Sequence, residues 1–157
     1  VIPDCIKAWL NYKKPLIRNP KSTRPWQHVL EVVSGYMLLA VKLSENKKLH
    51  KQIFNFGPSN KRNHTVLQLI NQLKINWPTI NWDIKKKQHQ YFESKLLKLN
   101  SNKIKKIIGW KSVLSFNETS KLVSDWYKNF TPNKNMYNLS CKQIEIFSGF
   151  FEKRIKK

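Results

Sequence analysis

Glycine is scarce in this chain, which has four glycines in 157 residues. Gly35, Gly57, Gly109 and Gly149 are each isolated from the others. A dinucleotide-binding turn needs several glycines close together, because only then can the backbone approach the pyrophosphate at a helix N-terminus. The spacing of the glycines therefore excludes that motif from this sequence.

Cysteine and long apolar runs are also rare. Cys5 and Cys141 lie near opposite ends of the chain and form no C-x-x-C pair, which argues against a disulfide framework and against a zinc site. The most apolar stretch, residues 29–43, contains Glu31 and Lys42 and is too short to span a bilayer. The first residues lack the layout of a signal peptide. We therefore expect no bound metal, no membrane segment and a cytoplasmic location.

Acidic residues are few, nine against 30 basic ones, and the formal net charge is +21. Such a charge is typical of proteins that bind nucleic acids or acidic membranes. Only four of the basic residues are arginines, however, and the 26 lysines accompany 16 asparagines and 14 isoleucines. A/T-rich codons specify these three residue types, whereas phosphate-clamping sites favour the planar fork of arginine. We attribute the charge mainly to codon composition and keep a small lysine-rich nucleic-acid-binding protein as the alternative.

The apolar residues predict a single helix-rich α/β unit over residues 1–157. Because Val1 already reads as the start of a helix, we expect the chain to be part of a longer protein. Helical spacing predicts a helix over residues 2–10 and another from Trp26 onward, whose apolar stripe we expect in the core. That stripe consists of Val29, Val32, Val33, Tyr36, Met37, Ala40 and Val41.

Later helices are predicted from their start and stop signals. Capping boxes at Thr65-x-x-Gln68 and Ser115-x-x-Glu118 mark two helix starts. Ser140-x-x-Gln143 marks a third, which gives a last helix over about 140–155. A short helix is also expected between Asn100 and Gly109. Short strands are expected at residues 16–17, 53–56, 77–84 and 96–99, which are too few to complete a sheet.

Three motifs in the first quarter of the chain are specific. Leu16-Ile17-Arg18-Asn19-Pro20 is followed by Arg24-Pro25-Trp26-Gln27-His28-Val29-Leu30-Glu31 and then by Ser34-Gly35-Tyr36. Together they closely resemble the CDP-glucose 4,6-dehydratases, which are members of the extended short-chain dehydrogenase/reductase (SDR) superfamily. The most telling piece is Arg24-Pro25-Trp26-Gln27-His28-Val29. Related epimerases and dehydratases look similar here but usually have an acidic residue at the position of Pro25.

The resemblance continues to about the start of the last helix. Its further motifs, in the order of the family, are Asn55-Phe56-Gly57-Pro58, Leu97-Lys98-Leu99, Gly109-Trp110 and Asp125-Trp126-Tyr127. The resemblance implies the helix-rich, C-terminal substrate-binding portion of an extended SDR, without its N-terminal Rossmann domain.

The same resemblance implies a function. This chain would be the CDP-glucose-binding part of an NAD-dependent lyase that makes CDP-4-keto-6-deoxyglucose for deoxysugar and lipopolysaccharide O-antigen synthesis. NAD would be bound by the full-length enzyme and not by this chain, which would be inactive alone. Its partners would be CDP-glucose and the missing half, and a homodimer of the full-length enzyme would form through that half.

The resemblance also assigns substrate-binding residues. A nucleoside diphosphate sugar needs a bidentate cation, amide donors and a flat apolar wall. Arg24 is expected to hold the diphosphate and Asn55 to donate to phosphate or sugar. The other assigned residues are Leu16, Ile17 and Arg18 along the nucleotide, Trp26, and Glu93, where the family also has an acid. Without the resemblance, Arg24 would be a solvated loop cation, Asn55 a strand cap and Trp26 a core residue.

We expect no catalytic residue in this chain. Tyr91-x-x-x-Lys95 matches the spacing of the catalytic tyrosine and lysine of the family, but in the family that pair precedes the region where this sequence starts. His28, at a helix start, is expected to be structural. A third interpretation is a pseudoenzyme module that assembles with a partner through its last helix.

Overall fold

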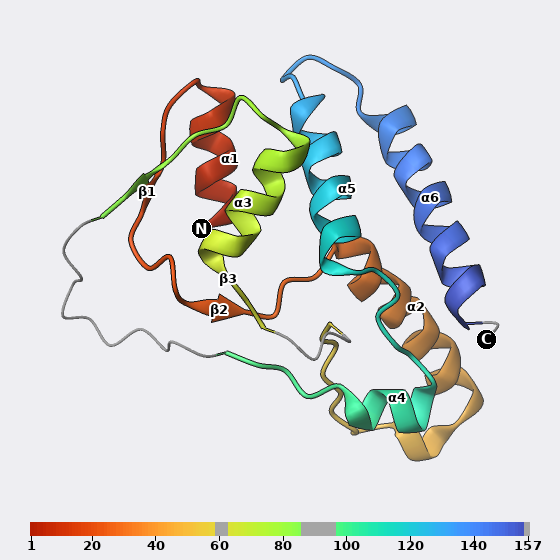
Figure 1. Ribbon diagram of the computed structural model, residues 1–157. Helices are drawn as coiled ribbons and strands as arrows, with labels where there is room; N and C mark the ends of the chain where they lie inside the picture. Colours follow the sequence, from red (N-terminus) through yellow and green to blue (C-terminus); the bar gives the residue numbers. More distant parts are fainter. Residues whose placement is uncertain (59–62, 86–96, 156–157) are drawn as a thin grey trace.

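The computed structural model describes residues 1–58, 63–85 and 97–155, and the structural statements below concern those residues. Helices dominate, with short strands between them (Figure 1). The helix-rich α/β prediction is therefore confirmed. The elements are α1 (Ile2–Leu10), β1 (Leu16–Ile17), β2 (Thr23–Arg24), α2 (Val29–Glu45), η1 (Lys47–Leu49), β3 (His64–Thr65), α3 (Val66–Asn76), β4 (Asp83–Ile84), α4 (Asn102–Ile108), α5 (Phe116–Lys128) and α6 (Tyr137–Ile155).

Local sequence signals start and stop several of these helices. At the start of α3, the Gln68 N–H donates to Thr65 Oγ1 at 3.1 Å and the Thr65 N–H donates to Gln68 Oε1 at 2.8 Å. The same reciprocal pair joins Ser115 and Glu118 at the start of α5. Helix α4 ends at Gly109, whose φ of 80° is a conformation that glycine adopts without steric cost. Both capping boxes and the terminal glycine are thus confirmed.

The described strands form two separate pairs. Strands β1 and β4 are parallel, with Leu16 opposite Asp83. Strands β2 and β3 are antiparallel, with Arg24 opposite His64. The strand predicted over 77–84 is limited to β4, and residues 97–99 form no strand. Each pair lies beside helices rather than within a larger described sheet.

The largest hydrophobic cluster joins α1, α3 and α5. Trp9 of α1 is 6% exposed, and Ile70 and Leu73 of α3 are 0% and 2% exposed. Phe116 and Val123 of α5 pack against the same cluster. Burying a large apolar side chain stabilises a fold by about 1.5–3 kcal/mol, so this cluster is a main source of stability. It fixes α3, and with it the strand β3 that pairs with Arg24.

The apolar stripe of α2 is exposed, so the prediction that it lies in the core is wrong. Five of its residues are between 43% and 67% exposed, and we call them the α2 stripe. Ala40 is exposed as well, and Val32 is half-buried. The α2 stripe consists of Val29, Val33, Tyr36, Met37 and Val41.

The opposite side of α2 makes the contacts. Glu31 and Gly35 are buried, and three leucines of the helix pack partly buried against a second cluster that contains Trp110. Both sides of α2 are apolar, so helical spacing alone cannot tell which side meets the rest of the chain. The packing of the neighbouring segments decides which side of α2 is buried.

Residues 53–56 form no strand, which corrects a second prediction. Ile53 is 81% exposed, while Phe54 and Phe56 pack partly buried against the Trp110 cluster. A strand requires hydrogen bonds to a neighbouring strand, and in the described part of the chain the two sheets are those of β1 with β4 and β2 with β3. The apolar sequence is present, but its ladder partner is not among the described residues.

Helix α6 begins at Tyr137, three residues before the predicted start at Ser140. Ser140 and Gln143 do not start the helix but join it to α5. The Trp126 Nε1–H donates to Ser140 Oγ at 3.1 Å, and Gln143 Nε2 donates to the Leu122 carbonyl at 2.6 Å. The polar pair that resembled a cap is therefore an interhelical contact.

Candidate functional site

Arg24, the predicted diphosphate ligand, lies at the end of β2. Its Cα partner across the antiparallel pair is His64. The side chain is half-buried, and its Nη1 donates to the Thr23 carbonyl at 2.8 Å. The segment before it is tied to the start of α3, since the Val66 N–H donates to the Ser22 carbonyl at 2.9 Å. The backbone that carries Arg24 is thus fixed by a strand pair and a helix start.

Trp26 anchors the segment that follows Arg24. Its Nε1–H donates to the His64 carbonyl at 2.9 Å, and its ring packs partly buried against the α1, α3 and α5 cluster. The His64 ring stacks on Phe116 with centroids 3.7 Å apart and planes 7° from parallel. Trp26 therefore has a structural role in holding β2 against β3. Its predicted contact with the nucleotide stays a prediction.

His28 caps α2. Its Nδ1 accepts a hydrogen bond from the Leu30 N–H at 3.3 Å, and the residue is 5% exposed. Burial lowers the pKa of His28 to about 4, so its ring is neutral at pH 7 and can accept this bond. The structural role predicted for His28 agrees with this geometry.

The residues of β1 alternate between exposed and buried. Leu16 is 54% exposed and Ile17 is 3% exposed, and Arg18 is again exposed. Successive strand residues point to opposite sides, so Leu16 and Arg18 share the open side while Ile17 faces the core. Leu16 and Arg18 can reach a ligand with their side chains, whereas a contact from Ile17 would have to come from its backbone.

Asn55 is exposed between two anchored aromatic residues. The Phe56 ring meets Tyr36 and Trp110 edge to face, with centroids 4.9 Å and 5.1 Å away. Gly35 permits this approach, since a Cβ at that position would lie 2.4 Å from the Phe56 ring. Asn55 is therefore positioned by the α2 and α4 side of the molecule, and Arg24 by the α3 side.

Glu93 lies outside the described residues, so the structure gives it no place. The other predicted binding residues come from three segments, namely β1, β2 with the residues that follow it, and residues 53–56. Their joint contact with one nucleotide sugar stays a prediction, as does the part assigned to Glu93.

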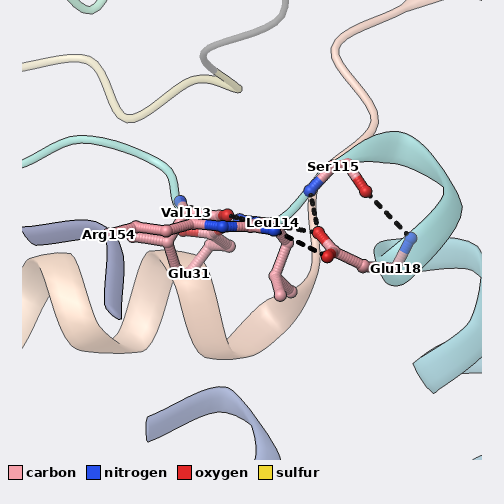
Figure 2. A network of polar contacts seen from close by, with 6 residues as sticks. All are labelled: Glu31, Val113, Leu114, Ser115, Glu118 and Arg154. Atoms are coloured by element: carbon pink, nitrogen blue, oxygen red, sulfur yellow. Dashed lines mark hydrogen bonds and ion pairs between the residues drawn. The ribbon is translucent and has the colours of Figure 1, made fainter. Parts of the chain in front are cut away.

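A buried carboxylate network at the start of α2 was missed by the sequence analysis (Figure 2). Glu31 is 1% exposed, and its Oε1 accepts hydrogen bonds from the N–H groups of Val113 at 2.9 Å and Leu114 at 2.6 Å. Ser112 Oγ donates to the same oxygen at 2.9 Å. Burial raises the pKa of Glu31, although these hydrogen bonds favour the carboxylate and oppose the rise.

Arg154 of α6 completes this network. Its guanidinium donates to the Val113 carbonyl and to both carboxylate oxygens of Glu118, at 2.8 Å and 2.7 Å. This bidentate pair lowers the pKa of Glu118 to about 2. Glu31 therefore joins α2 to residues 112–114 ahead of α5, and Arg154 joins α6 to the same segment and to Glu118 of α5. The signal for Glu31 was a lone acid in an otherwise apolar stretch of helix.

The described part of the chain offers no group of three or more His, Cys, Asp or Glu side chains that could bind a metal ion. Within the same ranges, no helix is both long and apolar enough to cross a membrane.

The sequence is similar to a known enzyme over most of its length. It is 32% identical over 147 residues to the CDP-glucose 4,6-dehydratase of Salmonella typhimurium. The aligned region covers 93% of this chain and 40% of that enzyme. The chain thus spans less than half the length of this relative. No protein-family model matches the sequence.

Solved structures show the same fold in longer chains. One is the UDP-glucuronic acid 4-epimerase of Bacillus cereus in complex with UDP-glucuronic acid and NAD. The match covers 80% of this chain and 38% of the epimerase chain, with a TM-score of 0.64 and 17% sequence identity. Another is the UDP-glucose 4-epimerase of Thermotoga maritima with UDP-glucose. Here the match covers 78% of this chain and 37% of the epimerase chain, with a TM-score of 0.61 and 21% sequence identity. The matched part is the C-terminal portion of such chains.

Proposed function

Because this chain belongs to the extended SDR superfamily and corresponds to the C-terminal portion of a CDP-glucose 4,6-dehydratase, we propose that it forms the sugar-nucleotide-binding side of such an enzyme. Its ligand is CDP-glucose, and the complete enzyme is a lyase that yields CDP-4-keto-6-deoxyglucose. The 32% identity over 93% of the chain is the observation that carries this proposal.

The arrangement around β2 supports binding of a diphosphate. A guanidinium offers a planar fork of donors that matches two phosphate oxygens, and Arg24 carries one on a backbone fixed by β3 and α3. The open side of β1 adds the apolar surface of Leu16 and the charge of Arg18. Asn55 supplies amide donors from residues 53–56, on the α2 and α4 side of the molecule. These are the kinds of group that a nucleoside diphosphate sugar requires.

The residues of this chain do not fit the pyrophosphate of NAD. The four glycines are isolated, and Gly109 serves to end α4 rather than to open a phosphate-binding helix. We therefore assign NAD to the portion of the complete enzyme that this chain does not span, and no catalytic step is attributed to the residues described.

The α2 stripe and residues 53–56 are the surface on which that other portion docks. The stripe exposes five apolar side chains along one side of a helix. Ile53, which follows α2 and η1 in the sequence, is 81% exposed. In α/β proteins a helix followed by an extended apolar segment covers a parallel sheet and adds a strand to it. The partner is therefore the sheet-bearing, NAD-binding portion. The same proposal gives the complete enzyme a cytoplasmic location and a homodimeric state. It also gives it a role in deoxysugar and lipopolysaccharide O-antigen synthesis.

Ligand preference tests the proposal. Isothermal titration calorimetry of the chain with CDP-glucose, UDP-glucose and CDP is expected to show binding of CDP-glucose and CDP, with UDP-glucose weaker. A random-sequence DNA duplex at several salt concentrations serves as the comparison. Steeply salt-dependent DNA binding without any response to CDP-glucose would instead favour the small basic nucleic-acid-binding protein.

A further inference from the structure

A cleft at the far end of α3 from β2 and β3 lies outside the predicted sugar-nucleotide site. Helices α1, α3 and α5 run in the same direction and end on this side of the molecule (Figure 1). The cleft measures 950 Å³ and is lined by the end of α1, the turn after α3 and the end of α5. The 11 residues of α3 span about 16 Å between its two ends, at about 1.5 Å per residue. None of its described lining residues is assigned to the sugar nucleotide.

The cleft has an aromatic surface that is held in place. The Trp9 and Trp77 rings meet edge to face with centroids 6.0 Å apart, and the Trp9 Nε1–H donates to the Asn81 carbonyl at 2.8 Å. Tyr127 and Phe130, from the end of α5 and just beyond it, add further aromatic surface. Pockets of this size with an apolar lining and a few polar groups are typical of sites for small organic molecules.

Charge around the cleft favours an anion. Four lysines are among its described lining residues, Lys7, Lys13, Lys14 and Lys128, and no Asp or Glu is among them. Three helices end here, and each helix C-terminus carries the equivalent of about half a negative charge. The three ends together amount to about −1.5, which four lysine charges exceed. The net charge around the cleft is therefore positive, and the lysines line the same cleft as the aromatic residues.

Tyr12, at the rim of the cleft, is strained and fully exposed. Its φ is 55°, a left-handed conformation that suits glycine at the end of a helix and is costly for a bulky residue. The Tyr12 N–H donates to the Trp9 carbonyl at 3.0 Å and the Lys13 N–H donates to the Ala8 carbonyl at 2.8 Å, which fixes this turn. The side chain is 101% exposed, so packing does not offset the strain. Such a residue is a candidate for contact with a ligand.

We propose that this cleft binds a small planar aromatic molecule that carries a negative charge. The ring of the ligand lies on the half-buried Trp77 ring, which the buried Trp9 ring holds in place from behind. Its charge lies beside Lys13 and Lys14, and the Tyr12 ring covers it. The proposal goes beyond the sugar-nucleotide function and does not depend on it, because the two sites share no assigned residue.

A pair of matched probes tests the proposal by calorimetry. Naphthalene-2-sulfonate has the planar ring and the charge, and naphthalene-2-sulfonamide has the ring without the charge. Tyr12→Gly is expected to weaken both probes by about threefold to tenfold, since it removes one aromatic contact. The double substitution Lys13→Gln and Lys14→Gln is expected to weaken the sulfonate by a similar factor of about three to ten and to leave the sulfonamide unchanged.

Control variants separate this cleft from other exposed surfaces. Tyr36→Ser removes an exposed aromatic ring from the α2 stripe, and Lys47→Gln with Lys48→Gln removes two charges from η1. Arg24→Gln tests independence from the sugar-nucleotide site. All three are expected to leave sulfonate affinity unchanged. The proposal is overturned if the chain does not bind the sulfonate at millimolar concentration, or if the control variants weaken it as much as the cleft variants do.

Discussion

Glu31 and Arg154 meet at one residue, since Glu31 accepts the N–H of Val113 while Arg154 donates to the carbonyl of Val113. The two residues are 123 positions apart in the sequence and lie on α2 and α6. A single peptide segment is thus held from both sides by opposite charges. Only residues 25–28 separate β2 from α2, so this network also helps to fix the chain beyond Arg24.

Replacing Glu31 tests the importance of this contact for the fold. Glu31→Gln keeps the size of the side chain but removes the charge and one acceptor oxygen, so buried N–H groups lose part of their bonding. We expect the free energy of unfolding to fall by about 1–3 kcal/mol, measured by urea denaturation. Glu45→Gln is the control, because Glu45 is an exposed residue of the same helix. Equal stability of Glu31→Gln and the parent chain would show that the network is dispensable.

Glu118 gives the fold a dependence on pH at the acidic end. Its pKa is lowered from 4.5 to about 2 in the folded chain, chiefly by Arg154. A lowered pKa stabilises the fold above the unfolded value, and this stabilisation is lost as the pH falls from about 4.5 towards about 2. The raised pKa of Glu31 acts with the opposite sign, so the parent chain alone does not isolate the effect.

The variant Glu118→Gln separates these two contributions, because glutamine retains the capping box but does not titrate. Melting temperatures are measured for both proteins at about pH 6 and about pH 3. We expect the parent chain to lose more stability than the variant between these two values. A parallel decline of both proteins would contradict the account.

Two glycines form a matched pair for backbone conformation. A Cβ at Gly109 or at Gly149 would meet nothing within 4 Å, so packing does not distinguish them. Gly109 has a φ of 80°, whereas Gly149 lies within α6. Gly109→Ala is expected to destabilise the chain by about 1 kcal/mol, and Gly149→Ala to stabilise it by up to about 1 kcal/mol. Thermal unfolding of both variants checks the opposite signs, and a shift of the same sign in both would be unexpected.

The α2 stripe is expected to limit the solubility of the isolated chain. Exposed apolar patches promote association, so Met37→Ser with Val41→Ser should lower light scattering at a given concentration. The melting temperature should stay about the same, because both side chains are exposed. The matched control is Ser44→Ala on the same helix. If the double variant scatters as strongly as the parent chain, the stripe is not the surface on which association depends.

Signals within a few residues predicted the local structure well. The capping boxes at Thr65 and Ser115 and the terminal Gly109 depend on neighbours three or four residues away, so the sequence displays them completely. The last helix shows the limit of such signals, since Ser140 and Gln143 had the spacing of a cap but bind α5 instead. A pattern of two residues does not show whether its partner is local or distant.

Features that depend on distant partners were not predicted. The two apolar sides of α2 are alike in sequence, and only the positions of Trp110 and the leucines of the helix decide which side is buried. Residues 53–56 have the composition of a strand, but a strand also needs a partner. Glu31 and Arg154, which both bond to Val113, lie on helices far apart in the sequence. The segment of Arg24 was identified through resemblance, because one arginine among 30 basic residues has no distinguishing local pattern.

The affinity of the chain for CDP-glucose with and without the Arg24 guanidinium is the decisive measurement for the sugar-nucleotide site. Calorimetry is expected to give a dissociation constant about 10-fold to 100-fold weaker for Arg24→Gln, because charge-assisted hydrogen bonds to the diphosphate are lost. Lys105→Gln, which removes one exposed charge from α4, should bind as the parent chain does. Equal affinities of Arg24→Gln and Lys105→Gln for CDP-glucose would contradict the assignment of this site.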